Sequence, residues 1–283
     1  MFASKKPTPD SAEHEAYFPS DFSLGLYVKS KSDYSDAVKS TVSTGPKKIL
    51  AILVDERYLP VEGGKLFSTG NHPVETLLPL MHLTEAGFDV EIATPSGLMG
   101  KFEYWAFPDK DDAVKEAFDA LLPQIREPKN LADVVQNDLG AESDYAAVFI
   151  PGGHGAMISL QNDENVGAVL RWALEAQRYI VTLCHGPAAL LAAAQDGEKP
   201  FDGYSIAVFP DSLDQGANVE IGYLPGKITW ALGDALLAQG VTLINDDMKG
   251  TVHADRRLLT GDSPLAANAL GKLAVGHLTG KSA

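Results

Sequence analysis

Short apolar runs alternate with amphipathic stretches over most of the chain after residue 47. The runs are rich in Val, Ile and Leu, which favours buried strands, and the amphipathic stretches favour helices. Strands are predicted at 48–54, 88–93, 145–150, 179–183, 205–209, 241–244 and 258–260, and helices at 73–86, 111–126, 165–176, 228–237 and 264–278. This alternation predicts an α/β fold in which a parallel sheet is sandwiched by helices.

The predicted helix at 73–86 has Asn71 near its amino end and Gly87 as its stop. Pro79 falls inside it and lacks the backbone N–H that a helix interior uses, so we expect a kink or a break there.

Two stretches depart from the alternation. Residues 1–46 are polar, and 97–140 hold an aromatic cluster at 102–107 followed by a charged helical stretch. We predict that 47–96 and 141–283 form the α/β core. The stretches 1–46 and 97–140 then pack together as a smaller accessory domain.

The single cysteine, Cys184, stands where the apolar run at 179–183 ends and small, helix-compatible residues begin. This pattern predicts a sharp turn from a strand into a helix, with the thiol at the corner. Backbone N–H groups and the positive end of a helix dipole favour a thiolate there, so Cys184 is a candidate nucleophile. The alternative is a buried structural cysteine.

The turn Pro151-Gly152-Gly153-His154-Gly155 follows the strand at 145–150. Gly152 and Gly153 allow backbone N–H groups to approach a substrate closely, as in an oxyanion hole, but a plain tight turn is equally compatible with them. The pattern is not G-x-G-x-x-G, so a dinucleotide site is poorly supported.

His185 could be a general base if its ring turns toward the sulfur, although adjacent residues on a helix do not face each other. A carboxylate should orient it, and Asp211 and Asp214 both follow a predicted strand. Either aspartate could instead cap a turn or a helix. Glu75 lies in the first turn of a predicted helix, where an exposed glutamate complementing the dipole is the simpler interpretation.

Metal binding is weakly supported, because the seven histidines form no H-E-x-x-H motif and paired cysteines are absent. A net charge of −15 disfavours stable binding of duplex nucleic acid, which needs a basic face. One cysteine excludes an intrachain disulfide. The amino terminus lacks the apolar core of a secretory signal, and no membrane-spanning segment is evident, so we expect a cytoplasmic protein.

Six stretches together resemble one known family. They are D-E-R-Y-L-P at 55–60, K-L-F-S-T-G-N-H-P at 65–73, K-F-E-Y-W at 101–105, P-G-G-H-G at 151–155, L-C-H-G-P at 183–187 and L-T-G-D-S-P at 259–264. In this order they resemble the HchA-type heat-shock chaperones and glyoxalases III of the PfpI superfamily. The resemblance covers nearly the whole chain after the first dozen residues.

The resemblance implies a flavodoxin-like core, a small second domain and a homodimer. It implies that Cys184 is the nucleophile, His185 its partner and Glu75 the proton-transfer residue. Asp214 orients the histidine, with Asp211 in reserve. Gly153 and the backbone N–H of His185 then correspond to the oxyanion donors.

Some members of this family bind a metal through two histidines and a glutamate. The corresponding positions here carry Thr84, Asp89 and Leu121. We therefore predict no such metal site, and no cofactor.

The resemblance implies a glyoxalase that converts methylglyoxal to lactate without glutathione, together with deglycase activity on glycated proteins or nucleotides. It also implies a stress chaperone that binds unfolded proteins. Two alternatives remain at this stage: a holding chaperone without physiological catalysis, and a cysteine hydrolase acting on small peptides.

Overall fold

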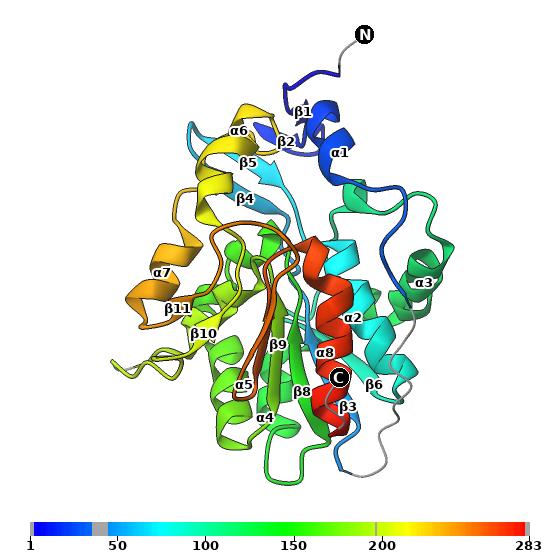
Figure 1. The fold of residues 1–283 in the computed structure, drawn as a ribbon, viewed down its shortest axis with the longest axis vertical. Helices are drawn as coiled ribbons and strands as arrows, with labels where there is room; N and C mark the ends of the chain where they lie inside the picture. The colour runs from blue at the N-terminus through cyan, green and yellow to red at the C-terminus, as the bar shows by residue number, and fades with distance from the viewer. Residues whose placement is uncertain (1–2, 36–44, 196, 281–283) are drawn as a thin grey trace.

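A seven-stranded sheet forms the centre of the molecule in the computed structural model, which describes residues 3–35, 45–195 and 197–280 (Figure 1). The strand order is β12-β13-β9-β8-β3-β6-β7. All neighbours are parallel except β12 and β13. The strands are β3 (Lys48–Ile52), β6 (Asp89–Thr94), β7 (Lys129–Asn130), β8 (Tyr145–Ile150), β9 (Tyr179–Leu183), β12 (Val252–Asp255) and β13 (Leu258–Gly261).

Alternate residues of each central strand enter different hydrophobic clusters. In β3, Leu50 and Ile52 pack into one cluster, whereas Ile49 and Ala51 pack into the other. Successive strand side chains point to opposite faces, and both faces of this sheet are covered, so the strands are apolar throughout. The predicted sandwich is confirmed.

Helices cover each face of the sheet (Figure 1). On one face lie α2 (Pro73–Glu85), α3 (Asp112–Arg126) and α8 (Ala267–Thr279). On the other lie α4 (Leu131–Asn137), α5 (Glu164–Glu175), the 3-10 helix η4 (Gly186–Ala193) and α7 (Leu232–Ala238).

A second sheet of four strands, in the order β1-β2-β5-β4, lies at one end of the molecule (Figure 1). Its strands are β1 (Thr8–Pro9), β2 (Ala16–Phe18), β4 (Tyr58–Val61) and β5 (Lys65–Ser68), and α1 (Asp21–Tyr27) follows β2. The amino-terminal stretch therefore pairs with residues 58–68, which lie inside the range predicted for the core.

The stretch 97–140 contributes to both parts of the molecule. Its strand β7 extends the main sheet beside β6, while Asp111 accepts hydrogen bonds from the backbone N–H and the hydroxyl of Ser32. The predicted division into a core and an accessory domain remains a prediction, and residues 36–44 of that division lie outside the described residues.

Several predicted elements differ in extent. Helix α2 continues through Pro79 without a break, so of the two expected outcomes the break is wrong and the kink remains a prediction. His72, which follows Asn71, is its N-cap. Strands β10 (Ser205–Ile206) and β11 (Thr242–Leu243) are short and form a separate parallel pair. The Asn245 side chain bonds the backbone of Val208 in both directions, and this contact replaces further ladder bonds. Among the described residues, no helix is long and apolar enough to cross a membrane.

Candidate active site

Cys184 lies directly after β9, at the corner predicted from the sequence. Its φ is +56°, in the left-handed region that non-glycine residues rarely adopt, and η4 begins two residues later. The backbone is held on both sides, because the Cys184 N–H donates to Gly261 and its carbonyl accepts from Phe209. Only 4% of Cys184 is exposed. A strained backbone with a buried thiol is typical of a functional corner.

The ring of His185 turns toward this sulfur. His185 Nδ1 lies 3.2 Å from Cys184 Sγ, and Nε2 lies 2.7 Å from Asp214 Oδ2. An Nε2–H that donates to Asp214 leaves Nδ1 free to accept the thiol proton. Burial lowers the pKa of His185 to about 4, and the neighbouring His154 acts in the same direction.

The two candidate aspartates have different partners. Asp214, in the π-helical turn η5 (Leu213–Ala217), is the one that contacts His185. Asp211 accepts the backbone N–H groups of Gly233 and Asp234 at the start of α7. The helix-capping interpretation therefore holds for Asp211, and Asp214 is left to orient the histidine.

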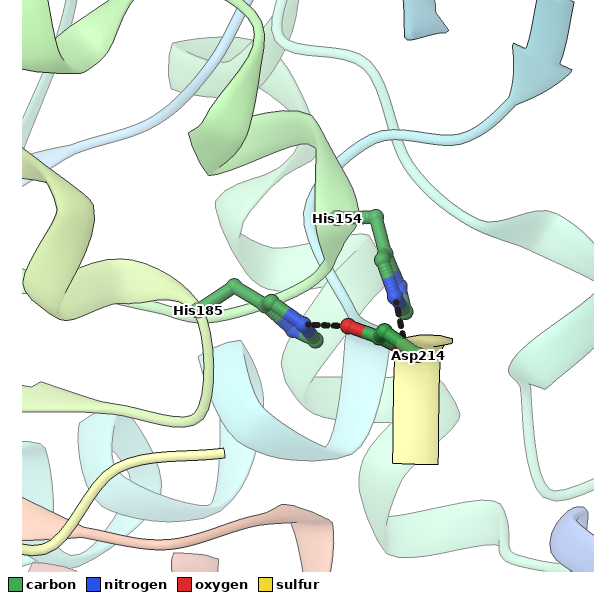
Figure 2. A group of neighbouring side chains, drawn as sticks. All are labelled: His154, His185 and Asp214. Atoms are coloured by element: carbon green, nitrogen blue, oxygen red, sulfur yellow. Dashed lines mark hydrogen bonds and ion pairs between the residues drawn. The ribbon is translucent and has the colours of Figure 1, made fainter. Parts of the chain in front are cut away.

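His154 is a member of this cluster that sequence reasoning did not single out. Its Nε2 lies 3.1 Å from Asp214 Oδ1, and its ring centroid lies 3.9 Å from that of His185. Figure 2 shows both imidazoles directed at the one carboxylate. His154 belongs to the glycine-rich turn, and nothing in the local pattern indicates which residue its ring meets.

Glu75 is completely buried, so the interpretation as an exposed surface glutamate is wrong. It lies in the first turn of α2, which points into the pocket. Neither carboxylate oxygen has a partner of ordinary hydrogen-bond geometry among the described residues, although the Cys184 thiol and the Gly153 N–H face the carboxylate. Burial raises the pKa of Glu75 well above its usual value.

Burial also raises the pKa of the Cys184 thiol, and the Glu75 charge raises it further. The Gly153 N–H acts in the opposite direction. A backbone N–H therefore favours the thiolate as expected, but burial and the carboxylate outweigh it. Two acids with raised pKa values in contact behave as a pair that shares one proton.

The two glycines of the turn are required by space. A Cβ on Gly152 would lie 2.1 Å from Glu75 Oε2 and 2.6 Å from Cys184 Cβ. Gly153 has a φ of +100°, and a Cβ there would lie 2.3 Å from the carbonyl oxygen of Gly70. The absence of side chains lets the turn pass beside the thiol, and the Gly153 N–H faces the sulfur.

A cavity of about 350 Å³ is lined by Glu75, Gly153, His154, Cys184 and His185. Trp105, Phe209 and Tyr223 contribute aromatic walls, and Glu103 is a further buried carboxyl group. Burial raises the pKa of Glu103 to about 7. Volumes of this order accommodate small organic ligands. Glu103 and Trp105 belong to the K-F-E-Y-W stretch at 101–105. The family resemblance of that stretch is the sequence feature that could have identified them as pocket residues.

His154, His185 and Asp214 are close enough to meet at one metal ion. Each histidine, however, bonds a different oxygen of Asp214, so these groups are satisfied without an ion. At the positions where some family members bind metal, the Thr84 hydroxyl bonds back to Leu80 O and Leu121 has no ligand atom. That this protein binds no metal there remains a prediction.

Comparisons with known proteins agree with the family resemblance of the six sequence stretches and with the observed fold. Residues 66–199 match the DJ-1/PfpI family. The chain is 55% identical over 277 residues to the protein/nucleic acid deglycase HchA of Staphylococcus aureus, covering 97% of this chain and 95% of that protein. This chain belongs to the DJ-1/PfpI family. Within the family it is similar to the HchA deglycases.

Solved structures of the DJ-1/PfpI fold show the same architecture at much lower identity. The rapid encystment protein of Francisella tularensis matches with a TM-score of 0.68 at 18% identity, covering 82% of this chain and 99% of that one. Glyoxalase III from Candida albicans matches with a TM-score of 0.63 at 23% identity, covering 81% and 96%. These two likenesses concern the fold alone.

Proposed function

We propose that this protein is a glutathione-independent glyoxalase that converts methylglyoxal to lactate, with deglycase activity through the same cysteine. The observation that carries the proposal is the position of Cys184 Sγ. It lies between His185 Nδ1 and the buried Glu75 carboxylate, with the Gly153 N–H facing it, and it lines the pocket. A nucleophile, a proton acceptor and an oxyanion donor thus converge on one point.

The proton shared by Cys184 and Glu75 suits this reaction. The thiolate attacks the aldehyde carbon, and the carbonyl oxygen takes the proton from Glu75 to give a hemithioacetal. The Glu75 carboxylate then removes the hydrogen from that carbon, forming an enediolate, and returns a proton to the neighbouring carbon. The product is a thioester of lactate. Water hydrolyses it, the thiolate leaves, and the net change is methylglyoxal plus water to lactate and a proton.

His185 has a supporting part in this scheme. Neutral imidazole accepts a proton from the attacking water, and Asp214 holds the ring in the tautomer that leaves Nδ1 free. The low pKa of His185 favours the neutral form near neutrality. Glu75, with its raised pKa, is the group suited to hold and return the proton.

Deglycase activity is supported by the similarity to the proteins named HchA protein/nucleic acid deglycase. An early adduct of a dicarbonyl on an amine or thiol retains the carbon that Cys184 attacks in the free aldehyde. Attack of the Cys184 thiolate on that carbon breaks its bond to the amine nitrogen or thiol sulfur. The amine or thiol leaves with the proton held by Glu75, and the hemithioacetal described above remains.

The deciding experiment is lactate formation from methylglyoxal without glutathione. We expect turnover by the wild type and a loss of about 100-fold or more in Cys184→Ser and Glu75→Gln, since each removes a group that reacts. Glu85→Gln, at the far end of the same helix, is the matched control and should retain activity. No turnover by the folded wild type would overturn the proposal.

The two aspartates provide a second matched pair. Asp214→Asn should lower kcat/KM by about 10-fold or more, because the amide cannot hold the His185 tautomer in the same way. Asp211→Asn should retain most activity and lose some stability at the start of α7. Equal activity losses in both variants would contradict the role proposed for Asp214.

A holding chaperone is the second candidate function. Leu26, Tyr27 and Leu265 are 58%, 37% and 40% exposed and line the pocket mouth, which gives unfolded chains an apolar surface. Protection of an aggregating client by Cys184→Ser at the wild-type level would support it. Loss of protection in that folded variant would show that the two activities are not separate. Cleavage of short peptides by the wild type would instead favour the hydrolase alternative.

A further inference from the structure

His154 is a buried titratable group that the scheme above leaves without a task. It is 3% exposed and is the first residue of the 3-10 helix η2 (His154–Met157), directly after Gly153. Its Nε2 contacts Asp214 Oδ1, while His185 Nε2 contacts Asp214 Oδ2. One carboxylate thus holds two imidazoles, and in an ordinary triad it holds one.

We propose that His154 is a positioning residue: as an imidazolium paired with Asp214 and packed against His185, it keeps the His185 ring uncharged. The inference rests on the proposed thiol chemistry only for its kinetic consequence. The protonation states themselves follow from the packing of the two rings and the carboxylate.

The charge balance within the cluster supports this assignment. A single carboxylate cannot compensate two positive rings whose centroids are 3.9 Å apart, because like charges at that distance disfavour each other. One ring is therefore charged and the other neutral. Asn218 Nδ2 also donates to Asp214 Oδ1 at 2.7 Å, so this carboxylate remains an ionised acceptor.

The surroundings decide which ring carries the charge. His154 is bonded by Asp214, and the buried carboxyl of Glu103 adds a weaker interaction where it is ionised. The other titratable groups near it are His72, His185 and Tyr223, and the rings of Phe67 and Phe209 also pack against it. Burial lowers the pKa of His154, but the contact with Asp214 outweighs burial and the net shift is upward.

His185 is in the opposite situation. Its ring lies against the aromatic ring of Phe209, and it faces Cys184, Asp214 and the charged His154. Burial and His154 together lower the pKa of His185, and Asp214 only partly offsets them. The consequence for catalysis is that the proton of Cys184 does not rest on His185. It remains with Glu75, whose carboxylate oxygens have no partner of ordinary hydrogen-bond geometry among the described residues.

The test is a pH titration of the histidine side chains by nitrogen-15 NMR, with the acid limb of kcat/KM for methylglyoxal measured in parallel. In the wild type at pH 6, we expect His154 to be charged and His185 neutral. In His154→Gln, whose amide still donates to Asp214, the midpoint of His185 should rise by ~1 pH unit or more as the like charge is removed.

The kinetic readout separates positioning from a merely structural role. If His154→Gln only loosens the site, kcat/KM falls by the same factor at every pH. If the inference holds, the acid limb moves upward, and the ratio of kcat/KM at pH 8 to that at pH 4 rises about 5-fold. His82→Gln is the matched control, because His82 is equally buried but pairs with Asn268.

Three results would overturn the inference: a charged His185 in the wild type at pH 6, an unchanged His185 midpoint in His154→Gln, or an equal shift in His82→Gln. The wild-type titration decides the matter even if His154→Gln does not fold. Absence of lactate formation by the wild type would defeat the proposed function but not this assignment, which the titration tests independently.

Discussion

The contact between Gly152, Glu75 and Cys184 leaves no room for another atom. The reacting pair is close because the residue between them has no side chain, and a Cβ at Gly152 would overlap both. Its neighbour Gly153 needs both its positive φ and its lack of a Cβ. At the scale of single residues, the pocket therefore depends on the absence of side chains at Gly152 and Gly153 as much as on its polar groups.

Gly152→Ala should lower turnover about 100-fold or more, because the new methyl group displaces the Glu75 carboxylate from the thiol. It should also destabilise the fold by about 1–3 kcal/mol through overpacking. Gly140→Ala is the control, since nothing lies within 4 Å of a Cβ there. Wild-type turnover in Gly152→Ala, measured as lactate formed, would show that the carboxylate is not needed beside the sulfur.

Glu103 gives a prediction about stability and pH. Its pKa is raised from 4.5 to about 7 by burial, so the folded state holds this proton more tightly than the unfolded state does. The free energy of unfolding therefore falls as the pH rises from about 4.5 to about 7, by about 3 kcal/mol at most. Glu103→Gln, which keeps an acceptor for the Thr69 hydroxyl, removes this loss.

We expect Glu103→Gln to stabilise the protein relative to the wild type more at pH 8.5 than at pH 5, measured by urea unfolding at both values. Glu116→Gln, at an exposed position of α3, should show no such difference. A stabilisation that is equal at both pH values would mean that Glu103 is ionised in the folded state throughout this range.

At the scale of elements, α1 is connected to the candidate site by a chain of hydrogen bonds. The Tyr27 hydroxyl donates to Asn218 Oδ1 at 2.9 Å, and Asn218 Nδ2 donates to Asp214 Oδ1 at 2.7 Å. Asp214 in turn holds His185. The last residue of α1 thus reaches the carboxylate that orients the histidine, although 191 positions separate Tyr27 from Asn218.

Tyr27→Phe should lower kcat/KM about 3- to 10-fold while changing the free energy of unfolding by less than ~1 kcal/mol, since the side chain is partly exposed. Methylglyoxal turnover and urea unfolding measure the two effects. Tyr17→Phe is the matched control, because its hydroxyl bonds only the exposed side chain of Glu15. Equal activity in the two variants would separate α1 from the site.

At the scale of the whole molecule, the two sheets have different origins in the chain. The main sheet is built mostly from successive strand-helix units, whereas the small sheet brings residues 8–18 beside residues 58–68 (Figure 1). The candidate site lies at the carboxyl ends of β8 and β9, where ligands bind in open parallel sheets. Residues from α1 complete its mouth.

The homodimer remains a prediction at this scale. Light scattering coupled to size-exclusion chromatography should give twice the chain mass of 30.2 kDa. Each chain carries a net charge of −15, so association should weaken at low ionic strength, where repulsion is less screened. A mass of one chain across salt concentrations and at micromolar protein would contradict the prediction.

The sequence by itself determined the layered α/β fold, the central strands and the corner at Cys184. These features follow from hydrophobic periodicity and from residues adjacent in the chain. The tertiary structure decided which aspartate meets His185, that Glu75 is buried, and that His154 shares Asp214. Those contacts join residues 29 and 60 positions apart, so they depend on how whole elements pack and leave no local pattern.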